Sequence, residues 1–483
     1  MSGYSRREFL RQMALVGMGT AGGLLLGACQ PTGKQAAEQP PAAQAPPTTA
    51  AKEPAKEAPK EKITLTVEMS VYVEAPHKKA FDMIEARYEE LHPEVDIVLY
   101  GPPYAEFWNK LTTEIVAGTE AEIVQLQSGA SRYASYAALR EGETGAFVNL
   151  DPYIKGTWME DGLTDQRNLT YNGHYIGLAN YAWGVGAIYY RKSMFEEAGI
   201  VADDIVTSED WLEAMLKLTK KGEGGKPDQF GYGAVLSSHS FVWSEPAAVI
   251  AKPANDGIYF PMEQPPYTPD RIAVNTDAMV WACQWWQDMI KKHQVVPIGN
   301  FEKADTRDLF WNKTAAMNTD GPWFLGMTRD RGEEIGEDLV ADMDVFASPD
   351  VLYNGQSKPR QGSVAGITHL ISSQCKYVDQ AWEFLAWMAS EEGQKLVSVC
   401  GMIPCSVEMQ ASDWYYAEYP LNAKVAGYNS TRYAPPMDSP KIPQLNEMTA
   451  LLTEAAQEMY IVGRDPKESL DRAAAEMKKI LEK

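Results

Sequence analysis

Cys29 is the residue of this sequence whose surroundings most clearly define a chemical reaction. It follows Leu26, Gly27 and Ala28, and small residues before a cysteine let a processing peptidase reach the backbone. The thiol that such cleavage leaves at the new N-terminus is a nucleophile that can be acylated. We therefore predict that residues 1–28 are removed as a signal peptide and that Cys29 is lipidated, which would hold the chain on the outer face of the cytoplasmic membrane.

The residues around Cys29 fit export to that face. Residues 5–11 (SRREFLR) match the twin-arginine export pattern, and residues 26–29 resemble the processing box of bacterial lipoproteins. Residues 13–28 are uncharged and fall short of the ~20 residues of a transmembrane helix, although an uncleaved N-terminal anchor is the alternative interpretation. Residues 29–62 are rich in Pro, Ala, Lys and Glu, and we interpret them as a solvated, extended tether.

The composition excludes several classes of protein. The chain has 483 residues, of which 45% are hydrophobic and 23% are charged, so it is long and apolar enough for a large folded core. Its 44 Lys and Arg residues against 66 Asp and Glu residues give a net charge of −22. A surface this acidic repels nucleic acid, and we expect no nucleic-acid partner.

The cysteines and histidines do not indicate a cofactor or metal site. The chain has five cysteines and six histidines without ligand spacing, so we expect no metal and no cofactor. Gly184-Val185-Gly186 lacks the third glycine of a nucleotide-binding loop. Outside the cytoplasm, Cys400 and Cys405 could form a disulfide or remain free, whereas Cys283 lies in an apolar helical pattern and is expected to be buried and free.

The folded body begins with an alternation of strands and helices. Periodicity predicts strands at 63–69, 95–99 and 123–126, separated by helices at 76–92 and 104–117. This order indicates an α/β fold with a parallel sheet, in which ligands bind beyond the carboxyl ends of the strands. Those ends are the polar segments 70–74, 100–104 and 127–131, and our candidate ligand contacts there are Tyr72, Glu74, Gln127 and Ser128.

Two further helical patterns end the chain. Residues 444–461 carry one apolar face, Gly463 stops the helix, and Asp465-Pro466 starts the next one. We expect this hairpin to be structural. Three tryptophans at helical spacing, Trp281, Trp285 and Trp286, are likewise expected to pack in a core.

Further stretches of the folded body resemble one known family. The order and spacing of these stretches are similar to those of the sugar-binding group of bacterial extracellular solute-binding proteins, which serve ABC importers and include the maltose-binding protein. The stretches are residues 186–200, 208–211, 309–317, 319–323, 364–372, 380–385, 401–404 and 440–444.

This resemblance implies a two-lobed α/β fold of the periplasmic-binding-protein type, with a ligand cleft between the lobes. The N-lobe would contain residues 63–180 and 366–410, and the C-lobe residues 181–362 and 411–483, with the chain crossing near 178–184 and 360–367. The resemblance further implies hinged closure on a sugar ligand, delivery to permease subunits of an ABC transporter, and no catalysis. We expect a monomer.

Tryptophan indicates the class of ligand. The flat indole can cover the apolar C–H face of a sugar ring, while amides and carboxylates bind its hydroxyls. Among the 13 tryptophans, our candidate contacts are Trp183, beside a proposed crossing, Trp243, which we place in a loop, and Trp323. Because Trp323 follows Gly321-Pro322, we expect it to project from a turn, with Gly321 leaving room for the ligand. Asp320 would accept hydrogen bonds from sugar hydroxyls.

Two other functions compete with sugar binding. A binding protein for a phosphorylated polyol or another non-sugar solute would need cations in the cleft, and Arg132, Arg191 and Arg360 are the obvious ones nearby. An exported glycoside hydrolase would need two carboxylates about 5–10 Å apart. An acidic chain offers many such carboxylates but no motif that selects a pair.

Overall fold

The computed structural model describes residues 62–126, 130–184, 186–256, 265–360, 365–429 and 442–482. These residues belong to one compact unit, Lys60–Lys483. The predicted signal peptide, Cys29 and the tether as far as residue 61 lie outside the described residues, as do Gln127 and Ser128. Within the described ranges, no helix combines the length and the apolar character needed to cross a membrane.

Six of the described strands form the first sheet, in the order β15-β6-β14-β3-β1-β2. β1 pairs in parallel with both β2 and β3, as the alternation of strands and helices predicts, whereas β14 runs antiparallel to its neighbours β3 and β6. The sheet is therefore mixed. Its strands are β1 (Ile63–Met69), β2 (Val95–Tyr100), β3 (Ile123–Leu126), β6 (Leu178–Trp183), β14 (Ala365–Ile371) and β15 (Ile403–Pro404).

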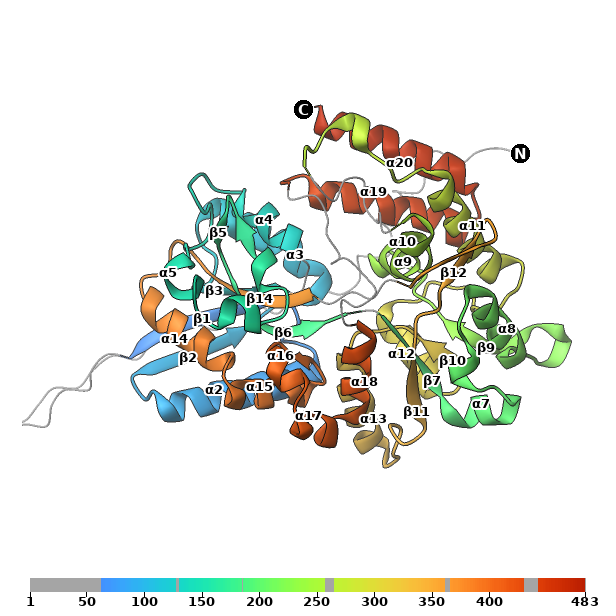
Figure 1. Ribbon diagram of the computed structural model, residues 1–483, viewed down its shortest axis with the longest axis horizontal. Coiled ribbons are helices and arrows are strands. Elements are labelled where there is room, and N and C mark those ends of the chain that lie inside the picture. The colour runs from blue at the N-terminus through green and yellow to red at the C-terminus, as the bar shows by residue number, and fades with distance from the viewer. Residues whose placement is uncertain are drawn as a thin grey trace, which may run out of the picture. The chain divides into compact units, whose positions relative to one another are not determined.

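Helices of both halves of the chain cover this sheet (Figure 1). Phe81 and Ile84 of α2 and Phe107 of α3 are buried in the same core as Leu65 and Val67 of β1. α3 ends at Gly118, whose φ of 71° is the left-handed conformation that glycine adopts most easily. The helices around this sheet are α2 (Ala75–Leu91), α3 (Tyr104–Ala117), α4 (Ala130–Ala137), α5 (Asp151–Ile154), α6 (Met159–Gly162), α14 (Val378–Met388) and α15 (Glu391–Val397).

Five described strands form the second sheet, in the order β11-β7-β10-β9-β8. β10 runs parallel to β9 and antiparallel to β7. The strands are β7 (Ala187–Arg191), β8 (Lys220–Lys221), β9 (Pro227–Gly233), β10 (Ala315–Asn318) and β11 (Met343–Ala347), and a separate hairpin is made of β12 (Val351–Tyr353) and β13 (Gln356–Lys358).

The second sheet has its own helices and its own hydrophobic core. α8 begins with a capping box, in which the Thr207 side chain accepts from the Asp210 N–H and the Asp210 side chain accepts from the Thr207 N–H. Trp211 of α8 and Trp286 of α11 are buried in this core. Its helices include α7 (Lys192–Ala198), α8 (Ser208–Leu218), α9 (Phe241–Pro246), α10 (Lys252–Ala254), α11 (Asp277–Lys291), α12 (Lys303–Trp311) and α13 (Trp323–Ile335).

The C-terminal hairpin packs against the second core, as Figure 1 shows for α19 and α20 beside α11. α19 (Leu445–Gln457) continues as a π-helical turn (Glu458–Val462) that ends at Gly463, where φ is 88°. Asp465 then caps α20 (Pro466–Leu481) by accepting from the Glu468 N–H. The predicted helical hairpin is confirmed.

The chain passes from one sheet to the other three times. β6 ends at Trp183 and β7 begins at Ala187, β13 ends at Lys358 and β14 begins at Ala365, and the chain returns after β15 through α16 (Val407–Gln410), α17 (Asp413–Glu418) and α18 (Pro420–Asn429). A small core of Ala182, Tyr189, Val345, Ile403 and Val425 joins the two sheets there. The predicted lobe boundary between residues 180 and 181 falls inside β6.

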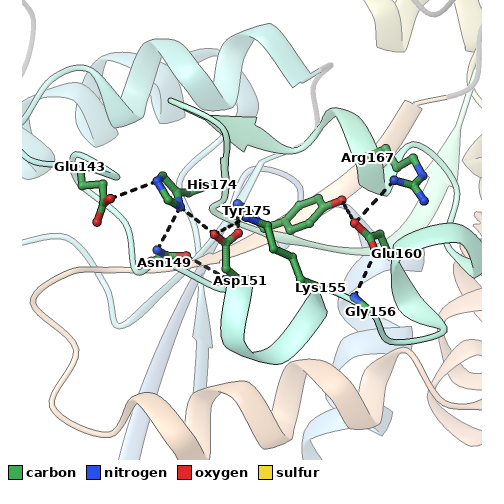
Figure 2. A network of polar contacts seen from close by, with 9 residues as sticks. All are labelled: Glu143, Asn149, Asp151, Lys155, Gly156, Glu160, Arg167, His174 and Tyr175. Carbon is green, nitrogen blue, oxygen red and sulfur yellow. Dashed lines mark hydrogen bonds and ion pairs between the residues drawn. The ribbon is translucent and has the colours of Figure 1, made fainter.

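A polar network fixes the hairpin of β4 (Thr170–Tyr171) and β5 (His174–Tyr175) to α5 and α6 (Figure 2). The Asp151 carboxylate lies 2.7 Å from His174 Nδ1 and accepts from the Tyr175 N–H at 2.9 Å. The Tyr175 hydroxyl donates to Glu160 at 2.7 Å, and burial together with this bond raises the pKa of Tyr175 to about 12. The carboxylates of Asp151 and Glu160 are thus both bound by groups of the β4–β5 hairpin. We therefore interpret the network as one that stabilises the fold.

Candidate functional site

A cavity of about 80 Å³ is lined by residues that follow strands of both sheets. Glu74 lies between β1 and α2, Tyr104 begins α3 after β2, and Trp183 ends β6. Trp323 follows β10 on the other side. The complete described lining is Glu74, Tyr104, Trp183, His239, Phe241, Lys303, Arg307 and Trp323. This placement at strand ends is where α/β sheets bind ligands.

Two tryptophans form an aromatic wall of this cavity. The ring centroids of Trp183 and Trp323 are 6.0 Å apart, and their planes are inclined by 41°. The indole nitrogens of both side chains are buried and have no hydrogen-bond partner among the described residues. A buried indole N–H normally finds an acceptor. The wall therefore offers flat apolar faces and two donors that a bound ligand could satisfy.

Tyr104 and His239 bring the two sides of the cavity into contact. Their rings stack with centroids 5.9 Å apart and an inclination of 14°. His239 Nδ1 accepts from the Phe241 N–H at 3.2 Å, so in the neutral imidazole the proton is on Nε2. Burial, and then the charges of Lys303 and Arg307, lower the pKa of His239 to about 4. The ring is therefore neutral at pH 7 and its Nε2–H is a donor.

Asp320 organises the two cations of the cavity. Its carboxylate accepts from Arg307 Nε at 2.8 Å and lies 3.8 Å from Lys303 Nζ. It also accepts from the Gly321 N–H at 2.8 Å. Burial favours the neutral acid, but the charges of Arg307 and Lys303 outweigh it and lower the pKa of Asp320. Lys303 further donates to the Thr319 carbonyl, so Lys303 and Arg307 are both held in place from one side.

The structure places three of the predicted contact residues in the cavity lining, and among the described residues it leaves Tyr72, Trp243 and Asp320 outside that lining. Trp183, Trp323 and Glu74 line the cavity, whereas Asp320 is only 1% exposed and lies behind Arg307. Tyr72 is absent from the described lining, because its hydroxyl donates to Asp82 at 2.7 Å.

The predicted position of Trp243 in a loop was wrong. Trp243 lies in α9, is 2% exposed, and packs in the core of the second sheet. The segment forms a helix because it is continuous with the buried π-helical turn Ala247–Ala251, which a search for loop residues does not reveal. It is Phe241, two residues earlier, that lines the cavity.

The predicted turn at Trp323 was also wrong in detail. Pro322 is the N-cap residue of α13 and Trp323 is the first residue of that helix. A Cβ atom at Gly321 would overlap the Trp323 ring, so the space that glycine leaves is filled by this indole rather than by a ligand. Trp323 is 5% exposed and belongs to the core of the first sheet, although it follows a strand of the second.

The cysteines form no disulfide among the described residues. Cys283, Cys375, Cys400 and Cys405 are all free and buried. The thiol of Cys400 donates to the Val397 carbonyl at 2.9 Å, so the possible pairing with Cys405 is not made. The expectation for Cys283 is confirmed. No group of three or more His, Cys, Asp and Glu side chains in the described ranges is placed to hold a metal ion.

Sequence reasoning missed five residues of the lining. Tyr104 is the last residue of a segment that was predicted to contact ligand, but it was not singled out. Lys303 and Arg307 are four residues apart on α12, and this spacing places two cations on one helical face. That spacing was the available signal, whereas nothing local marks His239 or Phe241.

The chain forms two sheets, each with its own helices and core, and passes between them three times. Residues from both sides line one cavity. These features define a two-lobed solute-binding fold. A profile of the family described as bacterial extracellular solute-binding protein matches residues 84–424. The chain belongs to this family, which consists of binding proteins rather than enzymes. The resemblance noted in the sequence and the predicted fold class are confirmed.

Similar proteins cover most of the chain. The arabinooligosaccharide-binding protein of Bacillus subtilis (strain 168) is 25% identical over 411 residues, which is 81% of this chain and 86% of that protein. The structure of an ABC transporter solute-binding protein from Thermotoga lettingae TMO, bound with α-D-tagatose, has a TM-score of 0.70 at 18% identity and covers 87% of this chain and 100% of its own. The maltotriose-binding protein of Thermus thermophilus, bound with maltotriose, has a TM-score of 0.66 at 19% identity, with coverages of 86% and 100%. At these identities, the likeness to solved structures concerns the fold.

Proposed function

We propose that this protein captures a saccharide in the cavity between its two sheets and delivers it to the permease subunits of an ABC transporter. The observation that carries the proposal is the pair of Trp183 and Trp323, which present indole faces beside the Glu74 carboxylate and the Tyr104 hydroxyl. Such an arrangement matches the apolar face and the hydroxyl rim of a sugar ring. The ligands of the similar proteins, an arabinooligosaccharide, α-D-tagatose and maltotriose, support the same class of ligand.

Isothermal titration calorimetry of the purified full chain tests this proposal. The titrants are arabinotriose, maltotriose and tagatose, each followed by chromatography of the recovered sugar. We expect saturable binding of at least one saccharide and recovery of that saccharide intact. Cleavage of a bound oligosaccharide would support the competing hydrolase, and binding of none of the saccharides in this panel or in an extended one would contradict the proposal.

A non-sugar anionic solute is the second candidate, and one observation favours it. Lys303 and Arg307 line the cavity, and both were missing from the cations expected near the cleft. Arg191, one of the expected cations, instead pairs with Asp342 at 2.7 Å in the second lobe. Titration with ribitol 5-phosphate separates this candidate from sugar binding, because tight binding without affinity for any saccharide would favour it.

We further propose that Cys29 is lipidated and anchors the protein to the outer face of the cytoplasmic membrane after twin-arginine export. The proposal rests on residues 5–11 and 26–29. The variant Cys29→Ser should either leave the precursor unprocessed or release the protein, and membrane fractionation with mass spectrometry of the N-terminus measures both. A Cys29→Ser protein that is processed and retained like the unaltered chain would contradict lipid anchoring.

A further inference from the structure

The polar groups of the cavity are mostly hydrogen-bond donors without acceptors. Arg307 uses Nε to bind Asp320, and neither of its Nη groups has a partner among the described residues. The Nε2–H of His239 likewise has no hydrogen-bond partner among the described residues, where only Nδ1 is bonded. Arg307 and His239 both line the cavity beside Trp183 and Trp323, whose indole N–H groups are buried and also have no partner among the described residues.

The acceptors of the described lining are fewer. Glu74 supplies a carboxylate, one oxygen of which lies 3.2 Å from His77 Nδ1. Tyr104 supplies a hydroxyl. Both residues come from the first sheet, whereas Arg307, Lys303 and His239 come from the second. The cavity therefore has an acceptor side and a donor side, and the donor side contains the two cations of the described lining, while Arg132 of α4 is hydrogen-bonded to Tyr104 on the acceptor side.

Lys303 and Arg307 lie on the donor side together with the buried carboxylate of Asp320. At the His239 ring, Lys303 and Arg307 act more strongly to lower the pKa than Asp320 and Glu74 act to raise it. The geometry explains this order, because the Asp320 carboxylate is buried behind the cations, where it binds the Arg307 Nε and the Gly321 N–H. Asp320 is thus a positioning residue: it binds Nε of Arg307 and leaves the two Nη groups free for a ligand.

We infer that the ligand is an acidic saccharide whose carboxylate binds the Nη edge of Arg307 and the Nε2–H of His239 while its ring packs against Trp183 and Trp323. This inference rests on the proposed saccharide-binding function and specifies its ligand. The planar guanidinium matches a carboxylate with two parallel hydrogen bonds. Lys303 and Arg307 are formally balanced by Asp320 and Glu74, so a singly charged carboxylate suits the cavity better than a doubly charged phosphate.

Matched pairs of saccharides test the inference on the full chain. Calorimetry would compare trigalacturonate with galactotriose and cellobiouronate with cellobiose, with glucose 6-phosphate against glucuronate as a third pair. Because hydrogen bonds between charged partners are the strong ones, we expect the uronate of at least one pair to bind at least about tenfold more tightly than its neutral counterpart. The advantage should diminish as salt is added.

The double variant Arg307→Gln/Asp320→Asn identifies the group that recognises the acid. It removes the guanidinium without leaving a buried, unpaired carboxylate. We expect uronate affinity in the double variant to fall to that of the neutral sugar measured on the same variant, because the charged contact with the carboxylate is lost. Arg331→Gln is the matched control, because Arg331 pairs with Glu334 on the surface of α13. If the double variant does not fold, Arg307→Lys retains the charge, removes the planar fork, and should still reduce the preference for uronate.

Each outcome separates this inference from the function on which it rests. Neutral saccharides that bind as tightly as their uronates in every pair overturn the acidic ligand and leave saccharide binding in place. Tighter binding of glucose 6-phosphate than of glucuronate overturns the carboxylate assignment. A uronate preference that survives in the double variant overturns the role of Arg307. Failure of every saccharide, neutral and acidic, overturns the proposed function itself.

Discussion

Replacing Trp183 with alanine removes one face of the aromatic wall with limited damage to a core. Trp183 is only partly buried against the first core, whereas Trp323 is 5% exposed and belongs to that core. Truncation of a buried aromatic anchor in a binding site typically costs at least about 2 kcal/mol. At 1.36 kcal/mol per tenfold change, this corresponds to a roughly thirtyfold loss of saccharide affinity.

The same substitution at Trp323 should behave differently. Trp→Ala at a core position costs about 3–5 kcal/mol of unfolding free energy, so Trp323→Ala should lower both the affinity and the stability of the unliganded protein. Trp183→Ala should mainly lower affinity. The contrast between the two variants follows from their burial and not from their residue type.

Calorimetry with the tightest saccharide and thermal unfolding without ligand measure the two effects. Trp158→Ala is the matched control, because Trp158 is 55% exposed beside α6 and is not part of the described lining. We expect Trp158→Ala to change the dissociation constant by less than about twofold, in line with a surface substitution. A Trp183→Ala protein that binds as tightly as this control would refute the stacking role.

Three further predictions concern the cavity wall, a buried acid and the lobes. Gly321→Ala forces a Cβ atom into the Trp323 ring, so it should destabilise the protein by about 1–3 kcal/mol and shift its tryptophan emission; unchanged emission and melting would contradict the described position of the indole. Burial raises the pKa of Glu245 from 4.5 to about 7. Between these two pH values the folded state keeps a proton that the unfolded state has lost, so the free energy of unfolding falls as the pH rises. The Glu245→Gln side chain cannot ionise, so only the unaltered protein loses this stability. The unfolding free energy of the variant minus that of the unaltered protein, measured with urea, should therefore rise by up to about 3 kcal/mol from pH 5 to pH 8. An equal difference at both pH values would argue against a buried acid. Saturating saccharide should reduce the radius of gyration in small-angle scattering, because a ligand bound by both lobes stabilises the closed form, and an unchanged radius would count against hinged closure.

The local elements of this fold were predictable from the sequence. The alternation of residues 63–69 gave β1 correctly, because Leu65, Val67 and Met69 on one face are buried while Thr64 and Thr66 on the other are not. The stop at Gly463 and the start at Asp465-Pro466 gave the C-terminal hairpin, because each residue acts within one helical turn. By contrast, the insertion of β14 between β3 and β6 depends on pairing between residues more than 180 positions apart in the sequence. Periodicity does not contain that information.

The candidate site was predictable only in part for the same reason. Glu74 was identified because it follows a predicted strand, Trp183 because it lies beside a proposed crossing, and Trp323 because it follows a Gly-Pro step. His239 was not, since its contact with Tyr104 joins residues far apart in the sequence. Asp320 was predicted to bind sugar hydroxyls, whereas in the structure its carboxylate binds Arg307. This pairing could not be predicted, because it depends on the packing of α12 beside β10.

A crystal structure of the full chain with the tightest-binding saccharide of the panel tests the binding site most directly. A sugar ring should lie against Trp183 and Trp323, with Glu74 within hydrogen-bond distance of its hydroxyls and, for a uronate, the carboxylate at Arg307. A saccharide bound elsewhere on the protein, with the cavity between the two sheets unchanged, would contradict the site described for this chain.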